Sequence, residues 1–262
     1  MATACITGAT AGIGRAFALA LAARGLDVIL VARDVERLRT VKVEIEETFA
    51  VNAEILPADL SIPSERGVVE TRLADRSRPV SVLVNNAGFG LRTPFVHTDV
   101  EDEQRSIDVL VTAVMRLTHA VLPGMVERNF GIVLNVSSVA GWITGGTYSA
   151  AKAWVTVFSE SLAAEFAGTG IRVVAVCPGF TRTEFHERAG IDMSELPSWL
   201  WLDADAVVAR ALRDAAIGQP ISVAGGVYQA LSAALRVLPR SLVRRAGRIR
   251  RSSARFGSRQ GN

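Results

Sequence analysis

The sequence predicts an α/β fold in which one mostly parallel, doubly wound sheet carries helices on both faces. Apolar runs of strand length alternate with segments of helical periodicity from the first residues onward. These runs are near-continuous in Val, Ile and Leu, as expected of strands that are covered on both faces. The chain has 262 residues, of which 49% are apolar and 21% charged, and this fits one large domain with a sizeable core.

The elements follow in chain order. Asp34 is placed as the N-cap of the second helix, and Gly25 closes the first. Strands are expected at 3–8, 27–33, 53–60, 80–88, 131–138 and 171–179. Helices are expected at 14–25, 34–49, about 64–76, roughly 100–127 and from Tyr148 to about 167, with a last strand and helix in the uncharged stretch 215–235.

The charge is unevenly divided along the chain. From Arg236 onward there are nine arginines and no acidic residue. Because the whole chain carries +3, residues 1–235 carry −6. We therefore expect one domain over 1–238 and a basic tail over 239–262.

The tail has the outline of a basic amphipathic helix, which suits the surface of an anionic membrane. Nucleic acid competes for the same charge but is the less expected partner, and a solvated disordered tail explains it equally well. The apolar face would hold Leu242, Ala246 and Ile249, and the basic face Arg244, Arg248, Arg251 and Arg255.

Cysteines and histidines exclude two kinds of site. Cys5 and Cys177 lie inside expected strands, so a disulfide framework is not predicted. The three histidines are scattered without ligand spacing, so we expect no metal site. The start of the chain has no signal-peptide pattern, and we expect a cytoplasmic protein, peripheral to the inner membrane surface if the tail binds lipid.

A glycine-rich turn follows the first expected strand. Gly8, Gly12 and Gly14 in "TGATAGIG" would let the backbone approach a pyrophosphate at a helix N-terminus. An acidic residue at the end of the second strand would favour NAD, but Arg33 stands there and can pair with a 2′-phosphate. The sequence therefore favours NADP(H).

The stretch "VSSVAGWITGGTYSAAKAW" at 136–154 brings a phenol and an ammonium together. Tyr148 and Lys152 are four residues apart, on one helical face. A nearby ammonium stabilises phenolate and so adjusts a proton donor toward neutral pH. The spacing alone also fits an ordinary surface helix.

Six motifs, in this order, resemble the short-chain dehydrogenase/reductase family over residues 1 to about 235. They are "TGATAGIG", "ADL" at 58–60, "NNAG" at 85–88, "VSS" at 136–138, "YSAAK" at 148–152 and "PG" at 178–179. The resemblance implies a Rossmann-type domain with a seven-stranded sheet. It also implies that Tyr148 is the acid in carbonyl reduction, that Lys152 lowers its pKa and binds the nicotinamide ribose, and that Ser138 holds the reacting oxygen.

The resemblance, together with Arg33, assigns a set of cofactor-binding residues. Asp59 is expected near the adenine, and the "NNAG" and "PG" segments along the rest of the cofactor. The full set is Gly8, Thr10, Gly12, Ile13, Gly14, Arg33, Asp59, Leu60, Asn86, Ala87, Gly88, Tyr148, Lys152, Pro178, Gly179, Thr181 and Thr183.

The chain departs from the family pattern at two places. The loop between Ser138 and Tyr148 is about three residues shorter than usual, which should alter the rim near Trp142 and Thr144 and leaves open whether Ser137 or Ser138 faces the site. Leu110 stands where many relatives carry an asparagine that helps relay protons to the lysine. Leucine offers no hydrogen bond to water. Either another group supports the relay, or the protein is a cofactor-binding scaffold with weak or lost catalysis.

The segment after Gly179 is expected to form a substrate lid over about 180–203. Its apolar residues suit an extended apolar substrate such as a ketoacyl compound, although they fit a seal against the body or a subunit contact equally well. We therefore expect an NADP(H)-dependent oxidoreductase interconverting a carbonyl and a secondary alcohol, forming homo-oligomers through the long helix and the Tyr148 helix as relatives do. The apolar residues are Phe180, Phe185, Met193, Leu196, Trp199, Leu200 and Trp201.

Overall fold

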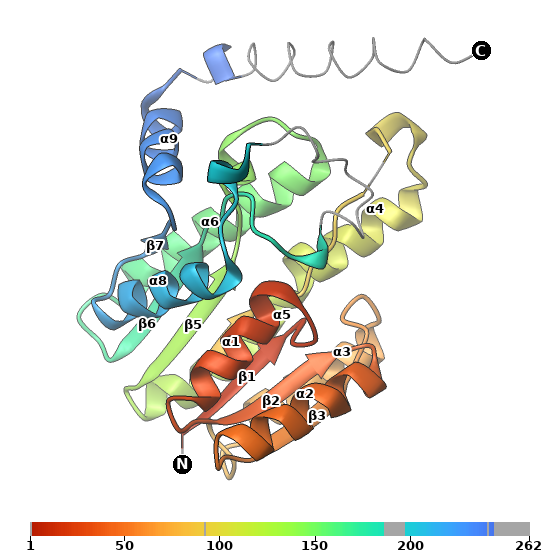
Figure 1. Ribbon diagram of the computed structural model, residues 1–262, viewed down its shortest axis with the longest axis vertical. Coiled ribbons are helices and arrows are strands. Elements are labelled where there is room, and N and C mark those ends of the chain that lie inside the picture. The colour runs from red at the N-terminus through yellow and green to blue at the C-terminus, as the bar shows by residue number, and fades with distance from the viewer. Residues whose placement is uncertain (1, 92, 186–196, 240, 244–262) are drawn as a thin grey trace.

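A single seven-stranded parallel sheet forms the centre of the molecule (Figure 1). The computed structural model describes residues 2–91, 93–185, 197–239 and 241–243. The strand order is β3-β2-β1-β4-β5-β6-β7, so the chain winds outward in both directions from β1. The strands are β1 (Thr3–Thr7), β2 (Asp27–Ala32), β3 (Ala53–Pro57), β4 (Val80–Asn85), β5 (Gly131–Val136), β6 (Ile171–Val176) and β7 (Ile221–Ser222).

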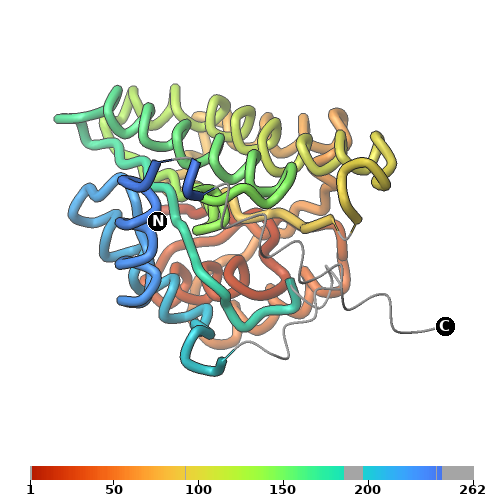
Figure 2. Tube along the Cα trace, turned by 90° about the horizontal axis from the view of Figure 1, so that it is seen from above, coloured from red at the N-terminus to blue at the C-terminus, as the bar shows by residue number. Residues whose placement is uncertain are grey.

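Helices cover both faces of the sheet and make three layers (Figure 2). One face carries α1 (Gly12–Ala22), α2 (Val35–Thr48) and α8 (Ala204–Ala216). The other carries α3 (Pro63–Ala74), α5 (Ala113–Glu127) and α6 (Thr147–Glu165). The remaining described helices are α4 (Val100–Ile107), α9 (Gly226–Val237), the π-helical turn Asp108–Thr112 and three short 3-10 helices, Phe95–His97, Val139–Trp142 and Ser198–Leu200.

The strands are apolar at successive positions because each face packs against its own core. In β2, Val28 and Leu30 belong to the core under α1, α2 and α8. Ile29 and Val31, the intervening residues, belong to the core under α3, α5 and α6. Alternate side chains of a strand point to opposite faces, so a doubly covered strand needs an apolar residue at every position. The expected doubly wound α/β fold is therefore confirmed.

Local signals set several helix ends as expected. The Asp34 carboxylate accepts a hydrogen bond from the Arg37 N–H at 3.0 Å and caps α2. Gly25 adopts a φ of +80° shortly after α1, where other residues would be strained. Both cysteines are buried and free, with Cys5 in β1 and Cys177 directly after β6.

The long helix differs from the expectation of one regular helix over 100–127. It runs through α4 and α5 with the π-helical turn Asp108–Thr112 between them. Val100–Arg128 is long and apolar enough to cross a membrane by length and composition, but half of its most apolar window is buried inside the fold. That burial is what a core helix requires, since α5 packs on α3 and β4.

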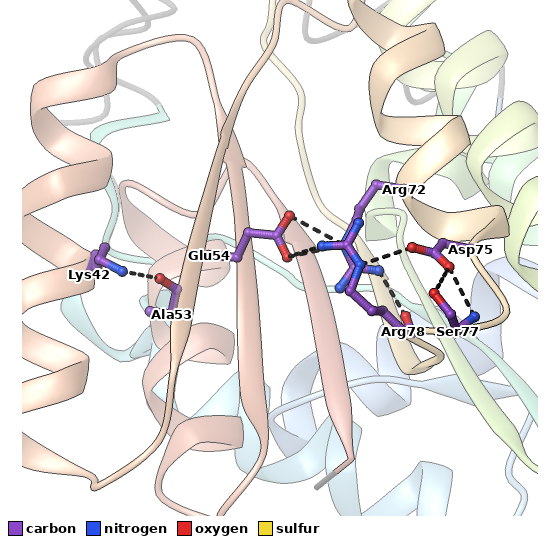
Figure 3. A network of polar contacts seen from close by, with 7 residues as sticks. All are labelled: Lys42, Ala53, Glu54, Arg72, Asp75, Ser77 and Arg78. Carbon is purple, nitrogen blue, oxygen red and sulfur yellow. Dashed lines mark hydrogen bonds and ion pairs between the residues drawn. The ribbon is translucent and has the colours of Figure 1, made fainter.

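An ion-pair network closes the β3 edge of the sheet (Figure 3). The buried Arg72 guanidinium of α3 donates to both carboxylate oxygens of Glu54 in β3, at 3.2 and 3.0 Å. It also donates to the Arg78 carbonyl at 2.8 Å, and so joins the end of the α3–β4 connection to the edge strand. This network lies among α3, β3 and the α3–β4 connection and does not include any of the candidate site residues.

Candidate functional site

The glycine-rich turn places the N-terminus of α1 at the carboxyl end of β1. Gly8 and Gly12 have φ values of +66° and +52°, which favour glycine. A Cβ on Gly14 would lie 2.2 Å from the Gly8 carbonyl oxygen. The helix start therefore lies too close to β1 for any residue other than glycine at this position. The N-cap residue of α1 is Ala11, whose side chain cannot accept a hydrogen bond. The first N–H groups of α1 are therefore not capped by this side chain. Such a helix start fits a pyrophosphate.

The "NNAG" segment after β4 is tied to this turn. The Asn86 amide nitrogen donates to the Thr7 carbonyl at 2.9 Å and to the Gly8 carbonyl at 3.3 Å. The backbone N–H groups of Asn86 and Ala87 both donate to the Thr7 hydroxyl oxygen at 2.9 Å. The ends of β1 and β4 therefore form one framework at the switch point of the sheet. Thr10 lies in the glycine-rich turn, and Ile13 lies in the first turn of α1.

Arg33 and Asp59 meet at the ends of β2 and β3. The Arg33 guanidinium lies 3.5 Å from the Asp59 carboxylate, and its side chain is 71% exposed. Partial burial opposes ionisation of Asp59, but hydrogen bonds from Ser61 and the Arg33 charge outweigh it and lower the pKa of the carboxyl. Leu60, next in the chain, is buried. The site thus has an exposed guanidinium and an ionised carboxylate at the end expected for the adenosine.

Two reciprocal hydrogen bonds join the end of β5 to α6. The Lys152 ammonium donates to the Val136 carbonyl at 2.7 Å. The Ser137 hydroxyl donates to the Lys152 carbonyl at 2.7 Å and lies the same distance from the Thr156 hydroxyl. Ser137 is therefore buried and held by backbone and core partners.

Of the two serines, Ser138 is the one whose side chain interacts with Tyr148, whereas Ser137 is bound to core partners. The Ser138 hydroxyl partly offsets the desolvation that raises the pKa of Tyr148 to about 12. Ser138 also accepts from the Ala140 N–H at 3.1 Å, which caps the 3-10 helix Val139–Trp142. The short loop fits because Gly141 lies against the α6 backbone, where a Cβ would be 3.0 Å from the Ala153 nitrogen.

Lys152 lies deep in the site and is 5% exposed. Desolvation lowers the pKa of its ammonium to about 8, although the buried Cys177 nearby opposes this shift. The nitrogen is 5.7 Å from the centre of the Tyr148 ring. The expectation that Lys152 lowers the pKa of Tyr148 is wrong for this structure, because desolvation raises that pKa and the ammonium is not among the groups that oppose the rise.

Leu110 borders the same ammonium from the π-helical turn. It is 1% exposed. A Cβ placed on Gly88 would lie 2.8 Å from a Leu110 methyl carbon and 3.9 Å from the Lys152 nitrogen. Leu110 thus presents an apolar surface beside Gly88 and close to the Lys152 ammonium, and its match to the relay position stays a prediction. Sequence reasoning missed the π-helical turn, an irregularity that occurs often at functional sites.

The segment after β6 crosses the site from the other side. Pro178 accepts from the Val139 N–H at 3.1 Å, so the "PG" pair lies against the loop after Ser138. The buried Thr181 donates to the Gly179 carbonyl at 3.1 Å. A Cβ on Gly12 would lie 2.9 Å from the Thr183 side chain, so Thr183 packs over the glycine-rich turn. The segment after β6 thus meets the glycine-rich turn at the carboxyl edge of the sheet, where most of the expected cofactor-binding residues lie, whereas Leu60 belongs to the core.

The described part of the lid divides between the site and the core. The Phe185 ring lies 5.8 Å from the Tyr148 ring and faces the site. Phe180 and Leu200 instead pack on the small core around Tyr228. For these two residues the structure favours the alternative in which they seal the segment against the body of the domain. Trp199 is 67% exposed. Met193 and Leu196 lie outside the described residues, as does all of the tail except 239 and 241–243.

Three residues that the sequence did not suggest connect to this region. The Tyr228 hydroxyl of α9 accepts from the Phe180 N–H at 3.1 Å and donates to the Leu200 carbonyl at 2.7 Å, joining both ends of the lid. Arg37 makes two hydrogen bonds to Glu184 at 3.0 and 3.2 Å. No local pattern in the sequence indicates either contact.

Fold and site together define a Rossmann-type protein with a dinucleotide cleft and a serine–tyrosine–lysine group beside it. The family model for short chain dehydrogenases matches residues 2–193, and the chain belongs to this family. The resemblance inferred from the motifs is confirmed.

Curated relatives of two kinds match the chain. A very-long-chain 3-oxoacyl-CoA reductase of Anas platyrhynchos is 39% identical over 192 residues, which cover 70% of this chain and 61% of the relative. A sulfoacetaldehyde reductase of Chromohalobacter salexigens is 38% identical over 185 residues, 69% of this chain and 72% of the relative. The chain thus spans about three fifths of the length of the 3-oxoacyl-CoA reductases that it matches.

Solved structures match over most of the chain. A short-chain dehydrogenase from Sphingobium yanoikuyae in complex with NADPH has a TM-score of 0.82 and 35% identity, covering 90% of this chain and 94% of the other. The bulky-bulky ketone specific alcohol dehydrogenase from Comamonas testosteroni has a TM-score of 0.78 and 30% identity, with coverage of 90% and 92%.

The pH dependence of turnover should report Lys152. Its pKa of about 8 lies far below the value of about 12 for Tyr148, so rising pH removes the ammonium charge first. We expect kcat/KM for carbonyl reduction to fall above about pH 8. In Lys152→Arg, which stays charged, this decline should disappear even if the rate is lower. A wild-type profile that stays flat to pH 10 would contradict the assignment.

Replacing Leu110 tests the relay position. Leu110→Asn should cost about 2–5 kcal/mol in unfolding free energy, because a buried leucine is lost and an amide must find partners. Where proton supply limits the rate, turnover should nevertheless rise, because the amide can bind water beside Lys152. Leu110→Ala is the matched control, as it removes the same contacts without adding the amide. Equal kcat values for the two variants would show that the position carries no relay.

Proposed function

We propose that the protein is an NADPH-dependent oxidoreductase that interconverts a carbonyl and a secondary alcohol. The observation that carries the proposal is the group formed by Ser138, Tyr148 and Lys152 at the carboxyl end of β5, opposite the glycine-rich turn. A phenol bonded to a serine hydroxyl and placed near a buried ammonium can give a proton to a developing alkoxide. The family match supports the same reaction class.

Each residue of this group has a separate task. Tyr148 is protonated at neutral pH, as tyrosines ordinarily are, and desolvation raises its pKa further, so it holds the proton that an acid needs in the reductive direction. Ser138, through the hydrogen bond that holds Tyr148, orients the carbonyl oxygen toward the phenol. Lys152 stabilises the phenolate that forms when the proton leaves. When bound, NADPH supplies the hydride.

The cofactor proposal rests on the two ends of the cleft. The N-terminus of α1, free of a capping side chain, would take the pyrophosphate. Arg33 is exposed, and its one ion pair among the described residues, with Asp59, is 3.5 Å long, so its guanidinium can turn to a 2′-phosphate. The NADPH complex of the Sphingobium yanoikuyae relative supports this preference.

The proposed substrate is an apolar carbonyl compound, such as a 3-ketoacyl chain. Phe185 brings an aromatic ring to Tyr148, and Leu110 keeps the far wall of the site apolar. The 3-oxoacyl-CoA reductases and the bulky-ketone dehydrogenase among the relatives support substrates of this class. A cofactor-binding scaffold is the second candidate, and Leu110 at the relay position is the observation that favours it.

Partners and location complete the proposal. Exposed apolar residues on α5 and α6, among them Met115, Val126 and Val157, suit pairing of two copies through these helices. The arginine-rich segment suits an anionic membrane surface. The free, buried thiols of Cys5 and Cys177 suit the cytoplasm.

Tyr148→Phe separates an enzyme from a scaffold. The variant keeps the ring and its packing but removes the acidic proton, so kcat should fall by about 10²–10⁴-fold. The measurement is NADPH oxidation with a panel of ketoacyl, steroid and small carbonyl substrates, and NADPH affinity should stay within a few-fold of wild type. Nearly full activity in this variant would favour the scaffold and exclude the proposed mechanism.

Arg33→Ala tests the cofactor preference. Losing a charge-assisted hydrogen bond to the 2′-phosphate should weaken NADPH binding by on the order of tenfold. This effect lies at the low end of the range for charged hydrogen bonds because the Arg33 side chain is largely exposed. NADH binding should hardly change, and calorimetry with both cofactors provides the comparison. Equal affinity of the wild-type protein for NADPH and NADH would contradict the proposal.

A further inference from the structure

Helix α9 exposes a wide apolar face. Only Tyr228 and Ser232 of this helix are buried. At 100° per residue, the exposed positions on the other side form one continuous arc without a charged residue. This arc consists of Val227, Ala230, Leu231, Ala233, Ala234, Val237 and Leu238.

The exposure is large for apolar side chains. Leu231 is 45% exposed, and Val237 is 83% exposed. A surface helix ordinarily turns charged or polar residues outward, and an apolar outer face indicates a contact with another body. The exposed apolar surface continues past the helix at Leu242, which is 51% exposed.

Helix α9 lies at the same end of the fold as the candidate site. It starts directly after β7 and projects beyond the carboxyl ends of the strands (Figure 1). The Arg236 guanidinium lies 4.7 Å from the centre of the Trp142 ring, in the loop that follows the catalytic serine. Tyr228 packs on Gly179 and joins both ends of the lid. The inner side of α9 therefore forms part of the frame around the substrate site.

A strongly basic segment begins within α9 and continues after it along the chain. Arg236 begins a segment in which nine arginines and no acidic residue occur. Eight of these arginines follow Pro239. An apolar helix face joined to a basic segment is the combination that binds the interface of an anionic bilayer.

We infer that α9 is a membrane-docking helix, and that its apolar face enters an anionic lipid surface beside the mouth of the substrate site. The inference rests on the proposed function, since it gives an apolar substrate a direct route from the bilayer to the site. The helix lies in the interface with its outer arc among the acyl chains, and the arginines after Pro239 bind the lipid phosphates.

Nucleic acid or a second copy of the chain would account for only part of the α9 surface and the basic segment. Nucleic acid would take the arginines but leave the apolar arc in water. A second copy packed on α9 would bring two strongly positive segments together, which costs electrostatic energy. An anionic bilayer satisfies both features of this surface at once.

Two variants separate the apolar and the electrostatic parts. Leu231→Gln with Val237→Gln removes apolar surface without changing the charge, and Arg→Gln at the eight arginines after Pro239 does the reverse. The matched control is Ile217→Gln with Val43→Gln. Both control residues are exposed and apolar, and Ile217 lies at the opposite end of the sheet, next to Gly218, which contacts Arg172 at the start of β6.

The measurement is co-sedimentation of the full chain with vesicles of phosphatidylcholine and phosphatidylglycerol. Wild type should sediment at low salt and much less with pure phosphatidylcholine. Each test variant should bind on the order of tenfold more weakly, and the control should bind like wild type. A long-chain 3-ketone carried in the vesicles should show a higher KM in the glutamine variants, whereas a short water-soluble ketone should not.

Several results would overturn the inference. Wild type that stays in the supernatant at low salt contradicts it, as does a Leu231/Val237 variant that binds like wild type. Light scattering that shows this variant splitting an oligomer, with no vesicle binding in wild type, would make α9 a subunit interface. Binding of wild type to an oligonucleotide but not to vesicles would assign the arginines to nucleic acid. Failure to turn over any soluble ketone, with vesicle binding intact, would instead contradict the proposed enzyme and not the docking helix.

Discussion

The candidate site depends on the reciprocal link between the end of β5 and the second turn of α6. Lys152 reaches back to the Val136 carbonyl, while Ser137 reaches forward to the Lys152 carbonyl. Breaking the first bond would leave the buried Lys152 ammonium without its acceptor, at considerable cost. The second bond is supported by Thr156, whose hydroxyl also donates to the Lys152 carbonyl at 3.0 Å. The link fixes the distance between strand and helix, and with it the positions of Ser138 on one side and Tyr148 on the other. A short glycine-containing loop can then connect them because its ends are already held.

This arrangement also explains why burial lowers the pKa of Lys152 to about 8. Its ammonium is buried beside Leu110 and has only one hydrogen-bond acceptor among the contacts described, the Val136 carbonyl. Leu110 is apolar and offers the ammonium no acceptor, and desolvation by burial is the largest influence on its pKa. An asparagine there would add a polar group and relieve part of that desolvation. The reactive side chains thus lie in a more apolar surrounding than an asparagine would give them.

Much of the fold could be predicted because its signals are local. The continuous apolar strands, the cap at Asp34 and the glycine turns each depend on a few neighbouring residues. The spacing of Tyr148 and Lys152 places them on one helical face, but their proposed roles and that of Ser138 came from the family resemblance. The choice between Ser137 and Ser138 depends on core packing around Thr156, which no local pattern encodes.

Other features depend on partners far along the chain and could not be predicted. Arg37 and Glu184, which are hydrogen-bonded, are 147 positions apart in the sequence. The hydrogen-bonded residues Tyr228 and Phe180 are 48 positions apart. Arg236 belongs to α9 and packs on Trp142, although the sequence counted it with the charge of the tail. The π-helical turn at Leu110 leaves no signal in the sequence pattern. It spans only five residues between two regular helices, which is too short for a periodicity of its own.

The hydroxyl of Tyr228 holds both ends of the lid in the same place, whatever lies between them. The cost of closing a loop whose ends are already anchored changes only slowly with its length. Insertions and deletions after Phe185 and before Leu200 should therefore be tolerated by the rest of the domain. Under the proposed function, one tyrosine would let substrate choice diverge without compensating changes in the catalytic group. The same junction is the natural place to graft lids from related proteins when new specificities are engineered.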